Sequence, residues 1–199
     1  MTKSGYVWVF VFLTLLGICS LVAAQDVLVQ SETVRPGTSV WMRGAAVELY
    51  EGDMKEGDNF LALIEDTDLE FDFKNRVTIV SLVPSIDTQV CEIQTKMLNN
   101  AEELHEDVDV VTISRDLPMA QSRFAREYEM DNIRFVSDYK TGAFGKKSGL
   151  MMKGKELLAR AILVLDEEGV ILHIQVVPEV SRLPDVNRAI AVANQLVRD

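Results

Sequence analysis

A cysteine follows an apolar stretch and stands at the beginning of a segment with helical spacing, in VPSIDTQVCEIQT at positions 83–95. A helix start places unpaired backbone N–H groups and the positive end of the helix dipole near Cys91, which favours the nucleophilic thiolate. Thr88 lies about one turn earlier, where its hydroxyl could donate to the sulfur. Pro84 has no N–H, ends the preceding strand and would shield the sulfur from water. This spacing indicates a reactive thiol.

Each of these residues also has a purely structural interpretation. Thr88 could serve only as a helix cap, and Pro84 only as a strand terminator. Cysteine is among the most buried residue types, so Cys91 could equally be inert. The chain has a second cysteine, Cys19, which lies in the apolar N-terminal segment. If that segment is removed, Cys91 is the only thiol left and an intramolecular disulfide is impossible.

The first 24 residues are typical of an export signal. Lys3 precedes a long apolar run that ends in small residues before the polar Gln25. This pattern predicts a signal peptide at 1–24, cleaved before Gln25. Because the run is nearly long enough to cross a bilayer of about 30 Å, an uncleaved membrane anchor is the alternative. Either way the protein is expected to be exported, to the periplasm or as a secreted protein.

Composition narrows the remaining possibilities. A chain of 199 residues has room for one domain, and its formal charge of −11 would repel nucleic acid. His105 and His173 are far apart and lack the nearby cysteines or paired carboxylates of a metal site. We therefore expect no nucleic-acid partner, no metal and no cofactor.

The pattern of elements predicts an α/β protein with a thioredoxin-like fold, in which helices flank a mixed central sheet extended by an N-terminal β-hairpin. Residues 25–39 are predicted to be a linker and residues 40–199 the folded domain. Extended segments are predicted at 40–50, 60–73, 77–83, 108–114, 133–137, 159–165 and 170–177, the last two as an antiparallel hairpin. Helices are predicted at 88–104, from Pro118, and from Pro184 or Asp185, with a flexible glycine loop at 142–149.

The segment Pro84–Glu92 closely resembles the peroxidatic-cysteine segment of the peroxiredoxins, which reads proline, three residues, threonine, two residues, cysteine. Four further segments resemble the thiol peroxidase branch of that family: SRDLPMAQSRF at 114–124, Phe144-Gly145, LLARAILVLDEEG at 157–169 and VVPEV at 176–180. The resemblance covers roughly residues 40–199, and the motifs occur in order.

The resemblance implies a thiol-dependent peroxidase that reduces hydrogen peroxide or alkyl hydroperoxides without a cofactor, on a fold that usually dimerises. Carried over by position, Cys91 is the peroxidatic nucleophile, Thr88 orients sulfur and peroxide, and Pro84 shields the site. Arg160 completes the set, since a fixed guanidinium stabilises the thiolate and the charge that develops on the peroxide oxygens.

One position departs from the family pattern. The atypical two-cysteine branch has a resolving cysteine after the Arg-Phe pair, and this chain has Ala125 there. A sulfenic acid on Cys91 would then need an external thiol, either a small thiol or a thioredoxin-like protein, to avoid irreversible oxidation. A redox sensor that forms a mixed disulfide with a partner, or a binding or holdase module without turnover, remain alternative functions on the same fold.

Overall fold

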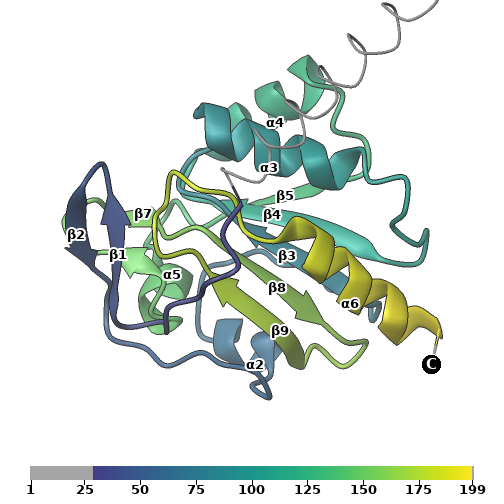
Figure 1. Cartoon of the computed structure of the whole chain (residues 1–199), viewed down its shortest axis with the longest axis horizontal. Helices are drawn as coiled ribbons and strands as arrows, with labels where there is room; N and C mark the ends of the chain where they lie inside the picture. The colour runs from purple at the N-terminus through teal and green to yellow at the C-terminus, as the bar shows by residue number, and fades with distance from the viewer. Residues whose placement is uncertain (1–28, 199) are drawn as a thin grey trace, which may run out of the picture.

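The computed structural model describes residues 29–198 (Figure 1). The predicted signal peptide or membrane anchor at 1–24 and the first residues of the predicted linker lie outside this described part. Within it, no helix is both long and apolar enough to cross a membrane.

A five-stranded mixed sheet forms the centre of the fold, in the order β5-β4-β3-β8-β9. Its strands are β3 (Thr78–Leu82), β4 (Asp109–Ser114), β5 (Arg134–Ser137), β8 (Ala161–Leu165) and β9 (Ile171–Val176). The first three are parallel to one another, whereas β8 runs antiparallel to β3 and β9 antiparallel to β8. This arrangement confirms the predicted thioredoxin-like mixed sheet and the 159–177 hairpin.

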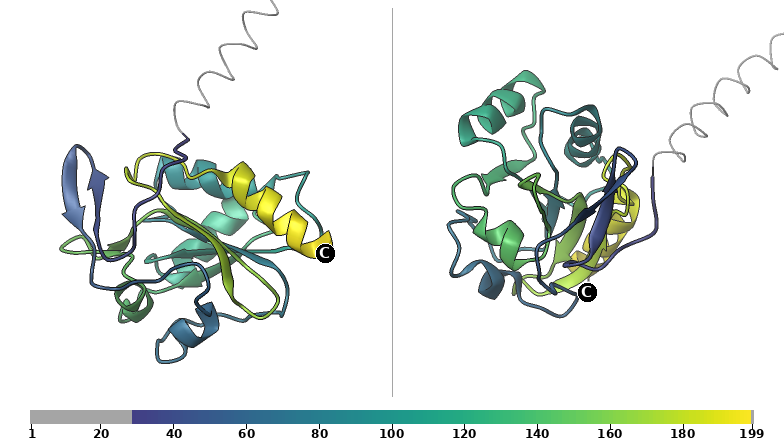
Figure 2. Two further views of the ribbon diagram at one scale, coloured as in Figure 1. Left: turned by 60° about the horizontal axis from the view of Figure 1, so that its bottom comes forward. Right: turned by 90° about the vertical axis from the view of Figure 1, so that its left-hand side faces the viewer.

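Helices cover both faces of the sheet (Figure 2). The long helices α3 (Gln89–Asn99) and α6 (Val186–Arg198) pack on the face that carries Ile79 and Val110. The opposite face carries Val80 and Val111, and two short helices cover part of it: α2 (Phe60–Ile64) and α5 (Ala143–Lys147). Two small antiparallel sheets also contribute to this side. One pairs β1 (Ser39–Met42) with β2 (Ala45–Glu48), and the other pairs β6 (Met151–Met152) with β7 (Leu157–Leu158). Helix α4 (Pro118–Glu127) packs beside β5. An N-terminal hairpin is present, but its strands β1 and β2 both come from the segment predicted as one strand at 40–50, and residues 60–73 take no part in it.

Two predicted elements were wrong. Residues 60–73 were expected to be extended, but α2 begins at Phe60 because Asn59 accepts a hydrogen bond from the Ala62 N–H at 3.0 Å and so caps a helix. The glycine loop at 142–149 contains α5 instead. Gly142 begins this helix with a φ of 67°, a backbone conformation that glycine adopts without strain.

The helix after the first central strand is shorter than predicted, and polar side chains share its buried side. It ends at Asn99, and residues 101–104 form a turn. The buried side chains are Cys91, Gln94, Thr95 and Leu98. The apolar residues Val90, Ile93 and Met97 are only partly buried, and Met97 packs against the core cluster that contains Leu98. Three of the four buried side chains therefore carry a polar or reactive atom.

Residues 29–38, which belong to the predicted linker, lie against the end of the sheet. The Gln30 N–H donates to the Leu183 carbonyl at 2.9 Å, and the Val34 N–H donates to the Val176 carbonyl at 3.0 Å. The Trp41 N–H, in β1, donates to the Pro178 carbonyl at 2.6 Å, and the Val180 N–H donates back to the Trp41 carbonyl at 3.0 Å. The N-terminal hairpin thus holds the 178–180 segment, which reaches the site described next.

Candidate active site

Cys91 is the third residue of α3, directly beyond the carboxyl end of the central strand β3. Thr88 occupies the N-cap position but makes no side-chain cap hydrogen bond. Its Oγ1 instead donates to Cys91 Sγ at 2.8 Å, with a second contact of 3.3 Å to the Ser85 carbonyl. The threonine hydroxyl is therefore committed to the sulfur rather than to capping the helix.

Arg160 approaches the same sulfur from the start of β8. Its guanidinium Nη2 donates to Cys91 Sγ at 3.3 Å, its Nε to the Val180 carbonyl at 2.8 Å and its Nη1 to Gln94 Oε1 at 2.7 Å. Three hydrogen bonds in different directions fix the guanidinium plane. The predicted residues Thr88, Cys91 and Arg160 thus come together, although Arg160 is distant from the other two in the sequence.

The environment of Arg160 bears on the ionisation of the cysteine. Only 2% of Arg160 is exposed, and within residues 29–198 no carboxylate forms a salt bridge with it. A buried cation without a counterion is costly, because its hydration is lost without compensation. A thiolate on Cys91 would supply that counterion across the contact of 3.3 Å.

Gln94 belongs to the site, although the sequence analysis did not select it. It is fully buried, and its Nε2 donates to Ser81 Oγ at 2.8 Å while its Oε1 accepts from Arg160. The signal was available as a polar residue one turn after Cys91. The sequence alone does not show whether Gln94 faces the site, because the same spacing also fits an exposed helix face.

Pro84 is buried and is the second residue after β3, in the connection that leads to α3. The preceding Val83 N–H donates to the Ile113 carbonyl at 3.1 Å, so the connection leaves the sheet at Pro84. The position agrees with a strand terminator. Shielding of the sulfur by the proline ring stays a prediction.

The sulfur is not reached directly by solvent, because Cys91 is 0% exposed. A cleft of about 360 Å³ lies next to it, with walls that include Ser85, Thr88, Arg123 and Tyr128. Thr88 lines the cleft and its Oγ1 contacts Cys91 Sγ at 2.8 Å, so this side chain links the cleft to the buried sulfur.

Ala125 lies on α4 and packs against a small hydrophobic cluster that contains Cys91 and Phe124. The helix position expected from the resemblance thus adjoins the cluster to which Cys91 belongs. Cys91 is the only cysteine within residues 29–198, and it is unpaired. No internal thiol is available in this part of the chain to reduce an oxidised Cys91.

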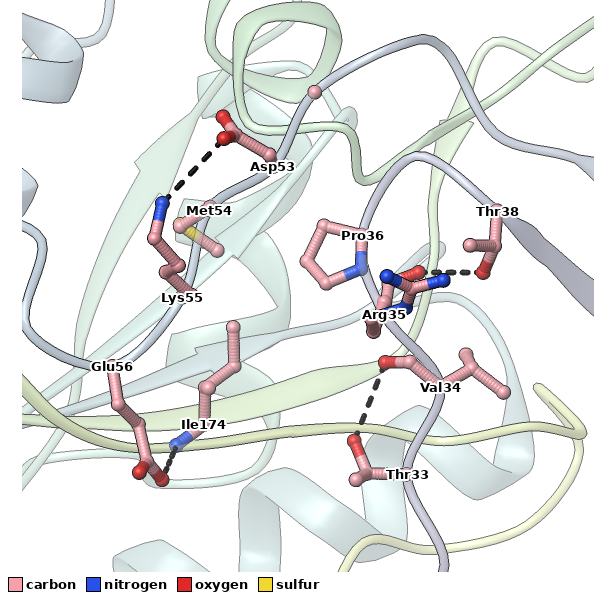
Figure 3. Close-up of a pocket in the computed structure, with 11 residues that line it drawn as sticks. Thr33, Val34, Arg35, Pro36, Thr38, Asp53, Met54, Lys55, Glu56 and Ile174 are labelled. Carbon is pink, nitrogen blue, oxygen red and sulfur yellow. Dashed lines mark hydrogen bonds and ion pairs between the residues drawn. The ribbon is translucent and has the colours of Figure 1, made fainter.

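A second pocket, of about 730 Å³, lies between the N-terminal segment and the loop after β2 (Figure 3). Arg35 and Pro36 form one side, Lys55 and Asp53 the other, and Lys55 forms a salt bridge of 3.5 Å with Asp53. The pocket shares no residue with the Cys91 site. Within residues 29–198, no group of three or more His, Cys, Asp or Glu side chains is placed to hold a metal ion.

The fold and the site define a class of protein: a thioredoxin-like domain with one cysteine at a helix start, contacted by a threonine hydroxyl and a buried guanidinium. The Redoxin family model matches residues 55–190. The thiol peroxidase of Bacillus subtilis (strain 168) is 37% identical over 165 residues, covering 80% of this chain and 98% of that protein. The thiol peroxidase of Staphylococcus epidermidis is 36% identical, covering 77% and 96%.

Solved structures agree with this assignment. A peroxiredoxin-like protein from Aquifex aeolicus superimposes with a TM-score of 0.70 at 28% identity, covering 83% of this chain and 99% of that one. A thiol peroxidase from Chromobacterium violaceum gives a TM-score of 0.67 at 14% identity, covering 81% and 98%, and shares the fold. The chain belongs to the peroxiredoxin family, among its thiol peroxidases, and is a thiol-dependent peroxidase.

Proposed function

We propose that Cys91 alone reduces hydrogen peroxide or alkyl hydroperoxides and that an external thiol then regenerates it. The observation that carries this proposal is the pair of contacts to Cys91 Sγ, from Thr88 Oγ1 at 2.8 Å and from Arg160 Nη2 at 3.3 Å. The Thr88 hydroxyl is neutral and can reorient, whereas the Arg160 guanidinium is a fixed cation. Together they suit a reaction in which negative charge passes from sulfur to oxygen.

In the first step the Cys91 thiolate attacks one peroxide oxygen, an S–O bond forms and the O–O bond breaks. The departing oxygen leaves as water or an alcohol after taking a proton, and the cysteine becomes a sulfenic acid. Thr88 is placed to turn its hydroxyl between sulfur and peroxide, because a hydroxyl both donates and accepts. Arg160 is placed to stabilise the charge on the oxygens as the bond breaks.

In the second step an external thiol attacks the sulfenic sulfur, giving a mixed disulfide and water. A second thiol then releases the Cys91 thiolate and leaves as a disulfide, so two thiols supply the two electrons. Both a small thiol and a thioredoxin-like protein can perform this chemistry. The presence of alanine at position 125 supports an external source, since the chain offers no second thiol there.

The test is peroxide consumption by the purified protein with an added dithiol. The wild type should turn over, and Cys91→Ser should not. Equal slow rates in both proteins would refute the peroxidase mechanism and favour a binding module. A mixed disulfide that persists with one specific protein in cells, without turnover by any thiol, would favour the redox sensor.

We further propose that the protein is exported and forms a homodimer. Export rests on the sequence of residues 1–24, which lies outside the described residues, and the mass of the purified native protein would distinguish a cleaved signal from a retained anchor. Dimerisation is suggested by the family and by two exposed apolar side chains at the start of α4, Leu117 and Met119, which are 48% and 73% exposed. A monomeric mass in sedimentation at micromolar concentration would contradict it.

A further inference from the structure

The cleft that Thr88 lines offers an external thiol an approach to the oxidised sulfur. It has a volume of about 360 Å³ and lies between the start of α3 and one face of α4. Thr88 forms part of its wall and also contacts Cys91 Sγ at 2.8 Å. This contact, independently of any charge, makes the cleft part of the reaction site.

Charged side chains in the wall of the cleft are mostly acidic. Asp87, Glu92, Asp116 and Glu127 contribute carboxylates, and Arg123 contributes the only cation among the lining residues described. A thiol that enters the cleft therefore meets lining charges that are negative in sum, whereas the sulfur beyond Thr88 lies 3.3 Å from the Arg160 guanidinium. The net charge of −11 on the whole chain acts in the same sense as the lining charges.

The carboxylates differ in how far they are neutralised. Glu92 forms a salt bridge of 2.5 Å with Lys96, and Asp116 accepts hydrogen bonds of 2.8 Å from Ser85 Oγ and the Ile86 N–H. Within residues 29–198, the carboxylates of Asp87 and Glu127 form neither a hydrogen bond nor a salt bridge. Both residues are exposed, so their charge acts directly on a molecule that enters the cleft.

Tyr128, which also lines the cleft, responds to this field. The carboxylate of Glu92 is the main cause that raises the pKa of Tyr128 above its ordinary value of 10.0, with further contributions from burial and from Glu127. Lys96 acts in the opposite direction and does not cancel the effect. The negative potential is thus felt at a second group inside the cleft.

We propose that the carboxylates of this cleft, principally those of Asp87 and Glu127, select the external reductant by charge. A small thiol with a positive group close to its sulfur is favoured, and one with a carboxylate is disfavoured. The inference rests on the proposed peroxidase function. The chemistry is the thiol step given above: an S–S bond forms, the S–O bond breaks, water leaves, and a second thiol releases Cys91.

The expected size of the effect follows from Coulomb's law. A unit charge about 7 Å from one carboxylate in water-like surroundings changes a rate about threefold. Two such carboxylates favour a cationic thiol and disfavour an anionic one by the same factor, so without screening they separate the two by about 50-fold at equal intrinsic reactivity. At an ionic strength near 0.1 M, where the Debye length is about 10 Å, the separation falls to about tenfold. Because the Debye length falls to about 3 Å at 1 M, high salt should remove most of this separation.

The test compares three small thiols of similar size, which are cysteamine, 2-mercaptoethanol and 3-mercaptopropionate. Their rates of Cys91-dependent peroxide turnover are measured for the wild type and for the double variant Asp87→Asn, Glu127→Gln. The quantity of interest is the cysteamine-to-mercaptopropionate ratio relative to wild type, because intrinsic thiol reactivity cancels in it. Glu167→Gln, in the turn between β8 and β9 at the opposite end of the sheet, is the matched charge control.

The ratio should fall about tenfold in the double variant and fall in high salt, while Glu167→Gln leaves it unchanged. Arg123→Gln removes the cation of the cleft and should raise the ratio, which provides a second variant of opposite sign. If the ratio does not change with these substitutions and with salt, or changes equally in Glu167→Gln, selection by charge is overturned. The proposed peroxidase function is not affected by that result. Absence of Cys91-dependent turnover with all three thiols would overturn the proposed function and this inference together.

Discussion

Replacing Arg160 by methionine tests whether its guanidinium takes part in O–O bond cleavage or only holds the fold together. The guanidinium Nη2 lies 3.3 Å from Cys91 Sγ in a site where Arg160 is 2% exposed. At an effective dielectric constant of about 20, unit charges at that separation interact by about 5 kcal/mol. Only the part that differs between ground state and transition state affects the rate, and loss of one such fixed donor costs about 10²–10³-fold.

The assay is the rate of Cys91 oxidation by excess hydrogen peroxide, followed by trapping the sulfenic acid and measuring its mass. Alkylation by iodoacetamide is measured in parallel, because it consumes the thiolate but breaks no O–O bond. We expect Arg160→Met to slow peroxide oxidation by about 10²–10³-fold and alkylation by clearly less. Equal losses in the two reactions, or a peroxide rate within threefold of wild type, would refute a role in stabilising the peroxide oxygens.

Two buried glutamines provide a matched comparison for this experiment. Gln94→Leu removes the 2.7 Å support of Arg160 Nη1 but leaves the cation in place, so we expect a loss of about tenfold. Gln121 is equally buried and donates to Ser114 Oγ and the Val136 carbonyl, both at 2.9 Å, without touching the cysteine. Gln121→Leu should therefore destabilise the fold by a comparable amount, about 1–3 kcal/mol, with little change in the peroxide rate of the folded protein.

Three further predictions concern other parts of the chain. Thr88→Val should slow peroxide oxidation at least tenfold and Thr88→Ser much less, because only serine keeps the hydroxyl bonded to the sulfur. Ala125→Cys should form an intramolecular disulfide with Cys91 after peroxide, seen as a mass loss of two hydrogens, whereas Ala191→Cys on the exposed side of α6 should not. Burial lowers the pKa of His173 below its usual 6.5, so stability should fall as pH falls from about 6.5 through the lowered value, and His173→Leu should abolish that loss in denaturant titrations.

Much of the fold was predictable because the residue pattern of most strands is itself typical of a strand. The apolar, β-branched run at 77–83 is typical of a strand covered on both faces, and Asp166–Gly169 has the residues of a tight turn between β8 and β9. The segment at 60–73 was not predictable in this way, since FLALI has no periodicity that separates strand from helix. The structure decides the matter through the cap at Asn59, whose amide also donates to the Glu168 carbonyl at 2.9 Å, far along the chain.

The site was predictable in its local half only. Thr88 and Cys91 are one helical turn apart, so helix geometry alone brings the hydroxyl to the sulfur. Arg160 reaches the sulfur through the pairing of β8 with β3, and no local pattern encodes that register, so the resemblance was needed to select it. Gln94 was not predicted, because its role is to accept a hydrogen bond from Arg160, and the sequence does not show that the two side chains meet.

Cys91 is buried and position 125 holds no cysteine, so access through the cleft determines whether oxidised Cys91 is reduced before it is oxidised irreversibly. After the first oxidation, a second peroxide and an external thiol compete for the same sulfenic acid, and the peroxide would destroy it. In the proposed mechanism both enter through the cleft lined by Thr88, so narrowing the cleft would slow them alike. The charge of the cleft can distinguish the peroxide from the thiol, because hydrogen peroxide is neutral whereas a thiol compound can carry a positive group. The carboxylates of Asp87 and Glu127 would raise the local concentration of such a thiol without attracting more peroxide, so their removal should increase irreversible oxidation of Cys91 at a fixed ratio of cysteamine to peroxide.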